Sequence, residues 1–280
     1  GAAVGVVVDG VPPGLALTVE DIQRDLDRRR PGQSGVTSAR REFDRAELLS
    51  GLVEGTTTGT PIAIVIRNEE HRSSDYERVR DAFRPGHADW TYQAKYGVRD
   101  WRGGGRSSAR ETAARVAAGA VARKILAGRG IAVTGYALEI AGIRAKRIDL
   151  AAIERNPVRS PDPEAAPLME QAIVEAKDEG DSVGGVVEVL ADGVPAGLGD
   201  PVFDKLEALL AHALMSVGAV RGFEIGTGFA AARMRGSAYN DELYAEAGRV
   251  RARTNNAGGV AGGISTGERI VVRCAIRPPA

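Results

Sequence analysis

The chain has 280 residues, 43% of them hydrophobic and 26% charged, and its 37 basic and 37 acidic residues give a formal net charge of zero. This composition is typical of a globular protein with a sizeable core and excludes a disordered chain. No apolar run approaches the ~20 residues of a membrane-spanning helix, so we expect no contact with a membrane.

The first predicted unit is a strand, a turn and a helix. Residues 4–8 are apolar and rich in valine, which predicts a buried strand. Thr18 and Asp21 form a capping-box pattern at the start of a helix, and Ile22 and Leu26 lie on its expected inner face.

The same unit recurs later in the chain. The turn Asp9–Leu15 (Asp-Gly-Val-Pro-Pro-Gly-Leu) returns as Asp192–Leu198 (Asp-Gly-Val-Pro-Ala-Gly-Leu), again between an apolar strand, 186–190, and a helix, Pro201–Val217. We interpret this as an internal duplication, which predicts two similar layers related by a pseudo-twofold axis. The alternative is that two similar turns arose by chance.

Hydrophobic patterns predict the other elements. Strands are expected at 61–66, within 131–143 and at 269–276. A helix over 164–179 carries Leu168, Ile173 and Val174, and the helix Pro201–Val217 is expected to bury Phe203, Leu206, Leu210, Ala213 and Leu214. The proline-rich segment Pro157–Pro167 is the expected boundary between two halves of a single domain, residues 1–280.

Three isolated residues carry smaller expectations. His71 lies in a polar segment and is expected to be an exposed loop residue, and His212 falls off the apolar line of its helix. The single cysteine, Cys274, lies in an apolar run and is expected to be a buried thiol. A reducing cytoplasm fits this cysteine content.

The segment from Phe83 to Thr112 holds most of the chemistry. Ser108 and Glu111 predict a second capping box, followed by an alanine-rich helix that ends at Gly128. The loop Gly103–Arg106 precedes this helix start, where free backbone amides favour an anion. Because Arg106 and Arg110 add fork-shaped donors, we expect a site for a small molecule with several negative charges.

His87 is the expected proton donor or acceptor of this site, because imidazole titrates near neutral pH. The alternative is a structural histidine with satisfied hydrogen bonds. Its Arg-Pro-Gly-His-Ala-Asp context, close to the glycine-rich loop, favours the catalytic interpretation.

Four strings of residues together resemble the chorismate synthase family. They are Arg-Arg-Arg-Pro-Gly-Gln (Arg28–Gln33), Arg-Pro-Gly-His-Ala-Asp (Arg84–Asp89), Gly-Gly-Gly-Arg-Ser-Ser-Ala-Arg-Glu-Thr (Gly103–Thr112) and Thr-Asn-Asn-Ala-Gly-Gly (Thr254–Gly259). They occur in the family's order, and the likeness covers essentially the whole chain. The resemblance implies an α+β fold, a β-α-β sandwich with helices between two antiparallel sheets, and a homotetramer.

The resemblance also implies the reaction, a 1,4-anti elimination of phosphate from 5-enolpyruvylshikimate 3-phosphate that gives chorismate and needs reduced FMN. His87 is the implied catalytic residue. The implied substrate-binding residues are Arg29, Arg84, Arg106 and Arg110. The implied flavin-binding residues are Arg29, Arg106, Ser107, Ser108, Gly218, Ala219, Asn255, Gly262 and Arg277. NADPH for flavin reduction is a further implied ligand, and the cytoplasm is the implied location.

Two departures from the family pattern qualify this expectation. The family often has arginine where this chain has Gly35, and its Gly-Glu-Ser-His-Gly and Gly-Arg-His-Asp-Pro motifs would fall outside residues 1–280. A truncated or degenerate relative that binds flavin and anions without catalysis is therefore the alternative hypothesis. A nucleic-acid binder is a third, suggested because arginine supplies 32 of the 37 basic residues, but the interleaved acidic residues oppose it.

Overall fold

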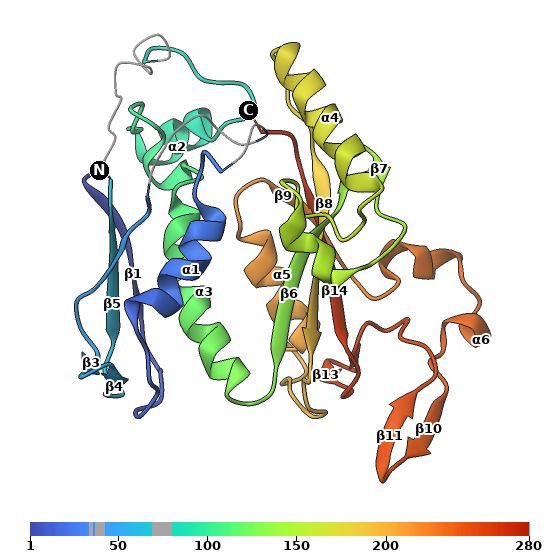
Figure 1. Cartoon of the computed structure of the whole chain (residues 1–280). Coiled ribbons are helices and arrows are strands. Elements are labelled where there is room, and N and C mark those ends of the chain that lie inside the picture. The colour runs from blue at the N-terminus through green and yellow to red at the C-terminus, as the bar shows by residue number, and fades with distance from the viewer. Residues whose placement is uncertain (34–35, 37–42, 69–79, 280) are drawn as a thin grey trace. The chain divides into compact units, whose positions relative to one another are not determined.

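The computed structural model describes residues 1–33, 36, 43–68 and 80–279. Within these residues the chain forms two compact units, Gly1–Ile125 and Leu126–Pro279 (Figure 1). The expectations for Gly35 and His71 concern residues outside the described ranges.

An antiparallel three-stranded sheet forms the base of the first unit. Strand β5 (Ile62–Arg67) lies between β1 (Ala3–Val8) and β2 (Ala46–Leu48), with Val8 opposite Ile62 in the register. A small hairpin pairs β3 (Leu52–Val53) with β4 (Thr56–Thr57). The helices of this unit are α1 (Val19–Arg29), α2 (Asp89–Tyr96) and α3 (Glu111–Ala127), and a short 3₁₀ turn spans Gly105–Ser107.

The core of the first unit lies between β5, α1 and α3. Ile62, Ile64 and Ile66 alternate along β5 and are almost fully buried. They belong to one cluster with Ile22 and Leu26 of α1, which confirms the predicted inner face of that helix. On α3 the buried residues are Ala113, Ala117, Ala120 and Val121, so small side chains let this helix pack closely, as expected.

Two local predictions for this unit need correction. Val7 is 67% exposed, so β1 is not a fully buried strand; it lies at the sheet edge and turns alternate side chains outward. The second predicted capping box is also wrong, because α3 begins only at Glu111 and the Glu111 carboxylate pairs with Arg115 at 2.9 Å. The first capping box, between Thr18 and Asp21, is confirmed.

A five-stranded antiparallel sheet forms the base of the second unit. The strand order is β7 (Ile143–Arg144), β6 (Ala132–Ile140), β8 (Gly185–Asp192), β14 (Ile270–Ile276) and β9 (Val220–Ile225). Its helices are α4 (Ala165–Asp178), α5 (Leu206–Met215) and the short α6 (Gly236–Tyr239), with 3₁₀ turns at Leu150–Arg155 and Gly228–Arg233. The remaining strands form two hairpins, β10 (Leu243–Glu246) with β11 (Arg249–Ala252) and β12 (Val260–Ala261) with β13 (Ile264–Ser265).

Leu206, Leu210 and Leu214 of α5 pack against the core of this sheet but are only half-buried, so their predicted burial is confirmed in part. Phe203, however, is 91% exposed, because the helix begins only at Leu206 and residues 201–203 belong to a turn before it. Ala213 and His212 are exposed, which contradicts the first expectation and confirms the second. The free Cys274 on β14 is buried, as expected, and burial raises the pKa of its thiol.

The helix predicted over 164–179 is confirmed as α4, but large apolar residues of its pattern do not form its packed face. Leu168 is 54% exposed and Val174 is 39% exposed, whereas Ala165, Ala166 and Met169 are buried. The packed face of this helix therefore consists largely of small side chains, which the search for large apolar residues overlooked.

The proline-rich segment 157–167 lies inside the second unit and carries a buried aspartate. The Asp162 carboxylate accepts hydrogen bonds from the backbone amides of Lys146 (2.8 Å), Arg147 (3.1 Å), Glu164 (3.0 Å) and Ala165 (3.4 Å). The amides of Arg147 and Lys146, followed by those of Glu164 and Ala165, lower the pKa of Asp162 to about 2. The expectation that 157–167 separates two halves of a single domain stays a prediction.

The repeated turns make the same hydrogen bonds in both units. In the first, the Leu15 amide donates to Thr57 Oγ1 at 3.0 Å, and this hydroxyl donates to the Pro12 carbonyl at 2.7 Å. In the second, the Leu198 amide donates to Ser265 Oγ at 2.9 Å, and that hydroxyl donates to the Pro195 carbonyl at 2.6 Å. Thr57 and Ser265 are each 3% exposed.

The correspondence continues through a second segment, 51–62 matching 259–270, which the sequence comparison missed. Thr58 donates from its amide to the Gly51 carbonyl, and Thr266 donates to that of Gly259, both at 3.0 Å. β1 then pairs antiparallel with β5, as β8 pairs with β14. These shared bonds support the interpretation of a duplicated unit.

This repeat gives a matched pair of stability variants. Thr57→Val keeps the side-chain shape but leaves the Leu15 amide and the Pro12 carbonyl without their partner, so we expect a loss of ~1–3 kcal/mol in unfolding free energy. Thr57→Ser installs the residue of the second copy and should cost under about 1 kcal/mol, the value of one lost methyl group. Urea unfolding followed by circular dichroism measures both, and an equal loss in the two variants would contradict the role of the hydroxyl.

Candidate active site

A buried carboxylate organises the loop that carries His87. Asp89, the first residue of α2, is only 2% exposed and accepts from Arg84 Nε at 2.8 Å and from the Arg84 amide at 3.1 Å. Its other oxygen lies 2.9 Å from His87 Nδ1 and 3.6 Å from Arg99 Nη1. The Arg84 side chain, supported by the Arg84 amide and by His87, holds the pKa of Asp89 far below its usual range.

This contact fixes how the imidazole is used. A carboxylate can only accept, so the bond to Asp89 favours the tautomer with the proton on His87 Nδ1. The Arg84 guanidinium, which can only donate, lies 3.0 Å from Nδ1 and 3.2 Å from Nε2, so in this tautomer Nε2 is the nitrogen that can accept from it. The opposite edge of the ring faces Gly104: a Cβ at that position would lie 3.1 Å from His87 Cε1 and 3.3 Å from Nε2. Gly104 also has φ +89°, so both the space and the backbone conformation favour glycine here.

The glycine-rich loop and the histidine loop therefore lie side by side, as the sequence predicted. The same Gly104 position is 3.0 Å from Ser107 Oγ, and this hydroxyl donates to the Gly104 carbonyl at 2.7 Å. The His87 side chain retains 18% exposure, so the ring stays partly accessible. The arrangement is suited to proton transfer at Nε2.

A second cluster joins two of the predicted arginines to an aspartate that the sequence did not single out. Asp44 Oδ2 lies 2.6 Å from Arg29 Nη1, and Asp44 Oδ1 lies 2.7 Å from Arg110 Nη1. Arg29 also donates to Thr112 Oγ1 and to the Ala109 carbonyl, both at 3.3 Å. Both arginines are thus held next to the start of α3.

The other predicted residues of this loop are more open. The Arg106 side chain is exposed and, in the described part of the chain, makes no hydrogen bond or ion pair. Ser108 is partly buried, and its hydroxyl accepts from the Arg110 amide at 3.3 Å. An exposed guanidinium beside glycine amides and a serine is a donor set that suits a phosphate group such as that of FMN.

The predicted flavin residues of the second unit fall into two groups. Ala219 and Arg277 are neighbours, since the Arg277 amide donates to the Ala219 carbonyl at 3.0 Å, and Gly218 directly precedes Ala219 in the chain. Gly262 lies in the β12–β13 turn beside Gly263, whose carbonyl accepts from the Leu206 amide at the start of α5. The two groups lie near opposite ends of β14: the Gly262 turn precedes its first residue, and Arg277 follows its last. A strand of seven residues is roughly 23 Å long.

Asn255 is used within its own loop. Its Nδ2 donates to the Arg269 carbonyl at 2.8 Å, and its Oδ1 accepts from the Gly259 amide at 2.8 Å. The neighbouring Asp241 binds the Thr254 hydroxyl at 2.6 Å and the amides of Asn256 and Ala257 at 2.8 and 2.9 Å. The Thr-Asn-Asn-Ala string is therefore closed by side-chain bonds rather than being a flexible loop.

Comparison with known proteins gives the family. The family model described as chorismate synthase matches residues 1–280. The chain belongs to the chorismate synthase family. A chorismate synthase of Syntrophobacter fumaroxidans is 60% identical over 278 residues, which cover 99% of this chain and 78% of the relative, and one of Methanosarcina mazei is 57% identical over 282 residues, covering 99% and 77%.

A solved structure titled as a crystal structure of chorismate synthase has a TM-score of 0.83 and 36% identity, and the match covers 99% of this chain and 82% of that one. The predicted chorismate synthase resemblance, the α+β fold class and the identification as a chorismate-forming lyase are confirmed. No helix among the described residues is long and apolar enough to cross a membrane. The individual site residues stay predictions.

The sequence analysis did not identify Asp44 as a site residue, and it named Asp89 only as part of a motif. Asp44 lies in Phe-Asp-Arg before a short strand, with no spacing pattern that links it to Arg29 or Arg110. Asp89 belonged to the quoted chorismate synthase string, but only the folded loop brings its carboxylate to His87. A carboxylate close in sequence to several arginines would have been the one available signal.

Proposed function

We propose that this chain forms chorismate by eliminating phosphate from 5-enolpyruvylshikimate 3-phosphate, with the reaction centred on His87. The observation that carries the proposal is the contact of the His87 ring with Asp89 on one side and with Gly104 on the other. Family membership supports the reaction, and the geometry supports these residues as its centre.

Arginines supply the charge that the substrate requires. The substrate carries a phosphate and two carboxylates, and guanidinium groups bind both kinds of group through paired hydrogen bonds. In the proposal Arg106 makes a direct contact, because its side chain is exposed beside the glycine loop. Arg29, Arg84 and Arg110 complete the positive surroundings, which replace water around the buried charges.

His87 moves the proton. Asp89 holds the ring through Nδ1, so Nε2 is the atom that exchanges a proton with the bound reactants. Reduced FMN, when bound, supplies the electron-rich ring system that the elimination needs. In the proposal Arg106, Ser107 and Ser108 would hold a flavin phosphate. The proposed flavin contacts of the second unit are Gly218, Ala219, Asn255, Gly262 and Arg277.

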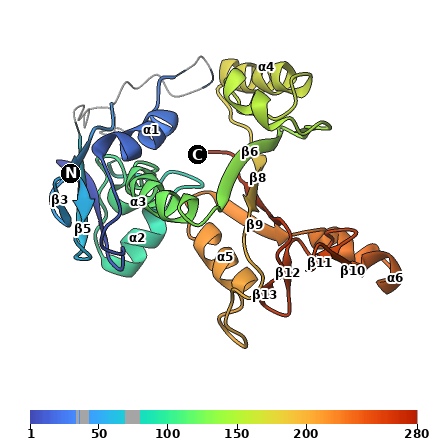
Figure 2. The same cartoon turned by 60° about the horizontal axis from the view of Figure 1, so that its bottom comes forward.

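Assembly belongs to the same proposal. The β10–β11 hairpin extends from the sheet of the second unit (Figure 2), and its Leu243 and Val250 are 67% and 65% exposed. Exposed apolar side chains on such a projection support contact with other copies, and we propose a homotetramer. NADPH as the source of reducing equivalents and a location in the cytoplasm complete the proposal.

The proposal predicts a specific effect of Arg106→Gln. With the substrate and chemically reduced FMN under anaerobic conditions, the unchanged chain should release chorismate and phosphate, and the variant should show a KM about tenfold to hundredfold higher because a charge-assisted contact is lost. Arg102→Gln is the matched control: Arg102 is also exposed but stacks on Trp101 at 5.2 Å, and KM should stay within about twofold.

Two outcomes would contradict this proposal. If the chain binds FMN and substrate but forms no chorismate, it is the binding module of the alternative hypothesis. If Arg102→Gln raises KM as much as Arg106→Gln does, the contact at Arg106 is not specific, and general surface charge explains binding.

A further inference from the structure

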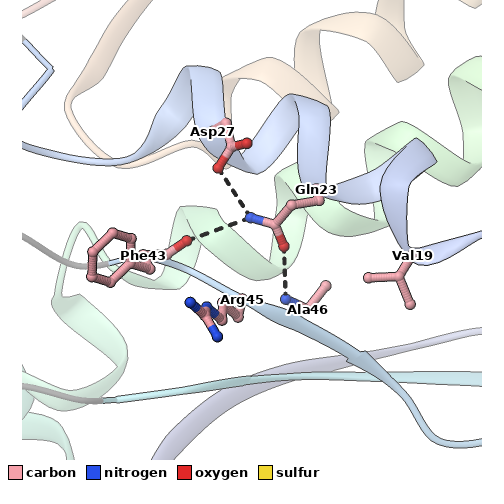
Figure 3. Close-up of a pocket in the computed structure, with 6 residues that line it drawn as sticks. All are labelled: Val19, Gln23, Asp27, Phe43, Arg45 and Ala46. Atoms are coloured by element: carbon pink, nitrogen blue, oxygen red, sulfur yellow. Dashed lines mark hydrogen bonds between the residues drawn. The ribbon is translucent and has the colours of Figure 1, made fainter.

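Asp44 is placed by contacts that leave its carboxylate little freedom. Its side chain is fully buried, and its backbone adopts φ +45°, in the left-handed region. Gln23 of α1 holds the flanking backbone: its amide nitrogen, Nε2, donates to the carbonyls of Phe43 and Asp44, both at 3.4 Å, and its Oε1 accepts from the Ala46 amide at 3.1 Å. Figure 3 shows Gln23 linked in this way to Phe43 and Ala46, beside a surface pocket.

Gln23 is itself fixed, because its Nε2 also donates to Asp27 one turn further along α1 at 3.1 Å (Figure 3). The segment 43–46 is therefore fastened to α1 on the pocket side, while the Asp44 side chain is buried. This fastening gives the carboxylate a defined position before any ligand binds.

The carboxylate then places two guanidinium groups. Each Asp44 oxygen accepts from one arginine, Arg29 at 2.6 Å and Arg110 at 2.7 Å, and the two arginine side chains are only 19% and 14% exposed. Outer contacts fix their planes: Arg29 donates to Thr112 Oγ1, and Arg110 donates to Asn68 Oδ1 and to the Arg67 carbonyl. Two arginines and one carboxylate leave this cluster with a net charge of plus one.

Without the carboxylate, two cations would lie close together in a poorly solvated place. They would repel each other, and long side chains relieve such repulsion by moving apart into water. The cluster is thus a device for keeping two guanidinium groups in a fixed geometry while retaining a net attraction for anions.

We propose that Asp44 is a positioning residue, which holds Arg29 and Arg110 in the geometry that binds the anionic substrate. This inference rests on the proposed function, since it assumes that the two arginines face that substrate. It assigns Asp44 no contact with the substrate itself.

The sign of the change in KM tests the inference. Asp44→Asn removes one negative charge, so a purely electrostatic role predicts tighter binding of the anion and a lower KM. A positioning role predicts the opposite: KM about tenfold to hundredfold higher, with kcat changed less, because the two guanidinium groups lose their shared acceptor. Calorimetric binding of 5-enolpyruvylshikimate 3-phosphate to the flavin-free chain should weaken by the same factor.

Two further variants keep the test decisive. Asp44→Glu retains the charge but lengthens the side chain, so it should also raise KM. This variant replaces Asp44→Asn in the test if Asp44→Asn does not fold. Asp21→Asn is the matched control: Asp21 lies on α1, the helix that carries Arg29, and pairs with Lys124 of α3, so its loss should lower stability without a change in KM. Nuclear magnetic resonance of the arginine Nε–H groups in the free chain should show those of Arg29 and Arg110 broadened in Asp44→Asn and unchanged in Asp21→Asn.

The outcomes separate this inference from the proposed function. A folded Asp44→Asn or Asp44→Glu chain with unchanged or lowered KM overturns the inference while leaving the reaction intact. If the unchanged chain neither binds nor converts the substrate, the proposed function fails, and with it the ligand assigned to the two arginines. Arginine signals that stay sharp in Asp44→Asn would also reject the positioning role.

Discussion

Replacing Asp89 by Asn is expected to lower turnover by a factor of about 10² to 10⁴, the usual contribution of a positioned acid–base group. The variant keeps the size of the side chain but removes the acceptor that holds His87 Nδ1 at 2.9 Å. An Asn amide group can donate to Nδ1 instead, which reverses the ring tautomer and changes the protonation of Nε2. Turnover with saturating substrate and reduced FMN is the measurement.

A double variant shows whether Asp89 acts through His87. We expect His87→Ala alone to lower turnover by orders of magnitude with the fold intact. If the aspartate works by orienting the histidine, adding Asp89→Asn to His87→Ala should change turnover by less than about threefold. If the two losses multiply, Asp89 acts independently of His87, for example by holding the loop through Arg84 and Arg99.

The effect of Asp89→Asn on the structure of the His87 loop is measured separately from turnover, as a change in folding stability. Asp89 is buried among arginines, so the substitution also costs folding stability. Comparing the thermal unfolding midpoints of Asp89→Asn, His87→Ala and the double variant shows how much stability each substitution removes. Equal turnover of Asp89→Asn and the unchanged chain would remove the carboxylate from the mechanism.

Arg273→Met is expected to destabilise the second unit by about 3–5 kcal/mol, the range for breaking a buried ion pair from one side. Arg273 on β14 lies opposite Glu188 of β8 and Glu224 of β9, and it binds Glu188 Oε2 at 2.5 Å and Glu224 Oε1 at 3.1 Å. Glu188 is only 6% exposed and also accepts from the Tyr136 hydroxyl. Removing the cation leaves that carboxylate buried without its charge partner.

The line of paired polar side chains on β8, β14 and β9 continues onto β6, where Tyr136 lies opposite Glu188. Burial, followed by the hydrogen bond to Glu188 and its charge, raises the pKa of Tyr136 well above its usual range. The tyrosine therefore stays protonated and donates to the carboxylate at any ordinary pH. The four side chains form one polar row across the sheet, and the arginine is its positive centre.

Guanidinium chloride unfolding of three variants tests the role of this row. Glu224→Gln should cost less than Arg273→Met, since the Glu224 side chain is 28% exposed and water can replace the arginine. Glu188→Gln combined with Arg273→Met should regain at least half of the loss, because no unpaired buried charge remains. A loss below about 1 kcal/mol in Arg273→Met alone would show that the row is not a stabilising network.

Local rules predicted the elements better than the contacts between them. The Thr18 capping box, the alanine face of α3 and the leucines of α5 follow from spacing alone, and each is found in the structure. The prediction for Phe203 failed because a periodic pattern does not say where a helix begins. Nor does the pattern reveal that small residues form much of the buried face of α4.

For the site, the sequence supplied the residue types but not their partners. His87, Arg29 and Arg110 stood out because histidines and arginines in these strings have a chemical use of their own. Asp44 and Asp89 become meaningful only through distances of 2.6–2.9 Å to residues that the chain brings together on folding. No spacing rule encodes such pairs, since they depend on how α1, α2 and α3 pack.

The duplicated unit contains a record of divergence between its two copies. Glu54 and Gly262 occupy equivalent turns, and both adopt left-handed backbone conformations, with φ +47° and +61°. A side chain fills this place in the first copy, whereas in the second the space above Gly262 is open to at least 4 Å. The two copies therefore differ at this turn: the first carries the Glu54 side chain, whereas the second leaves open space above Gly262, the room that the proposed flavin contact at Gly262 would need.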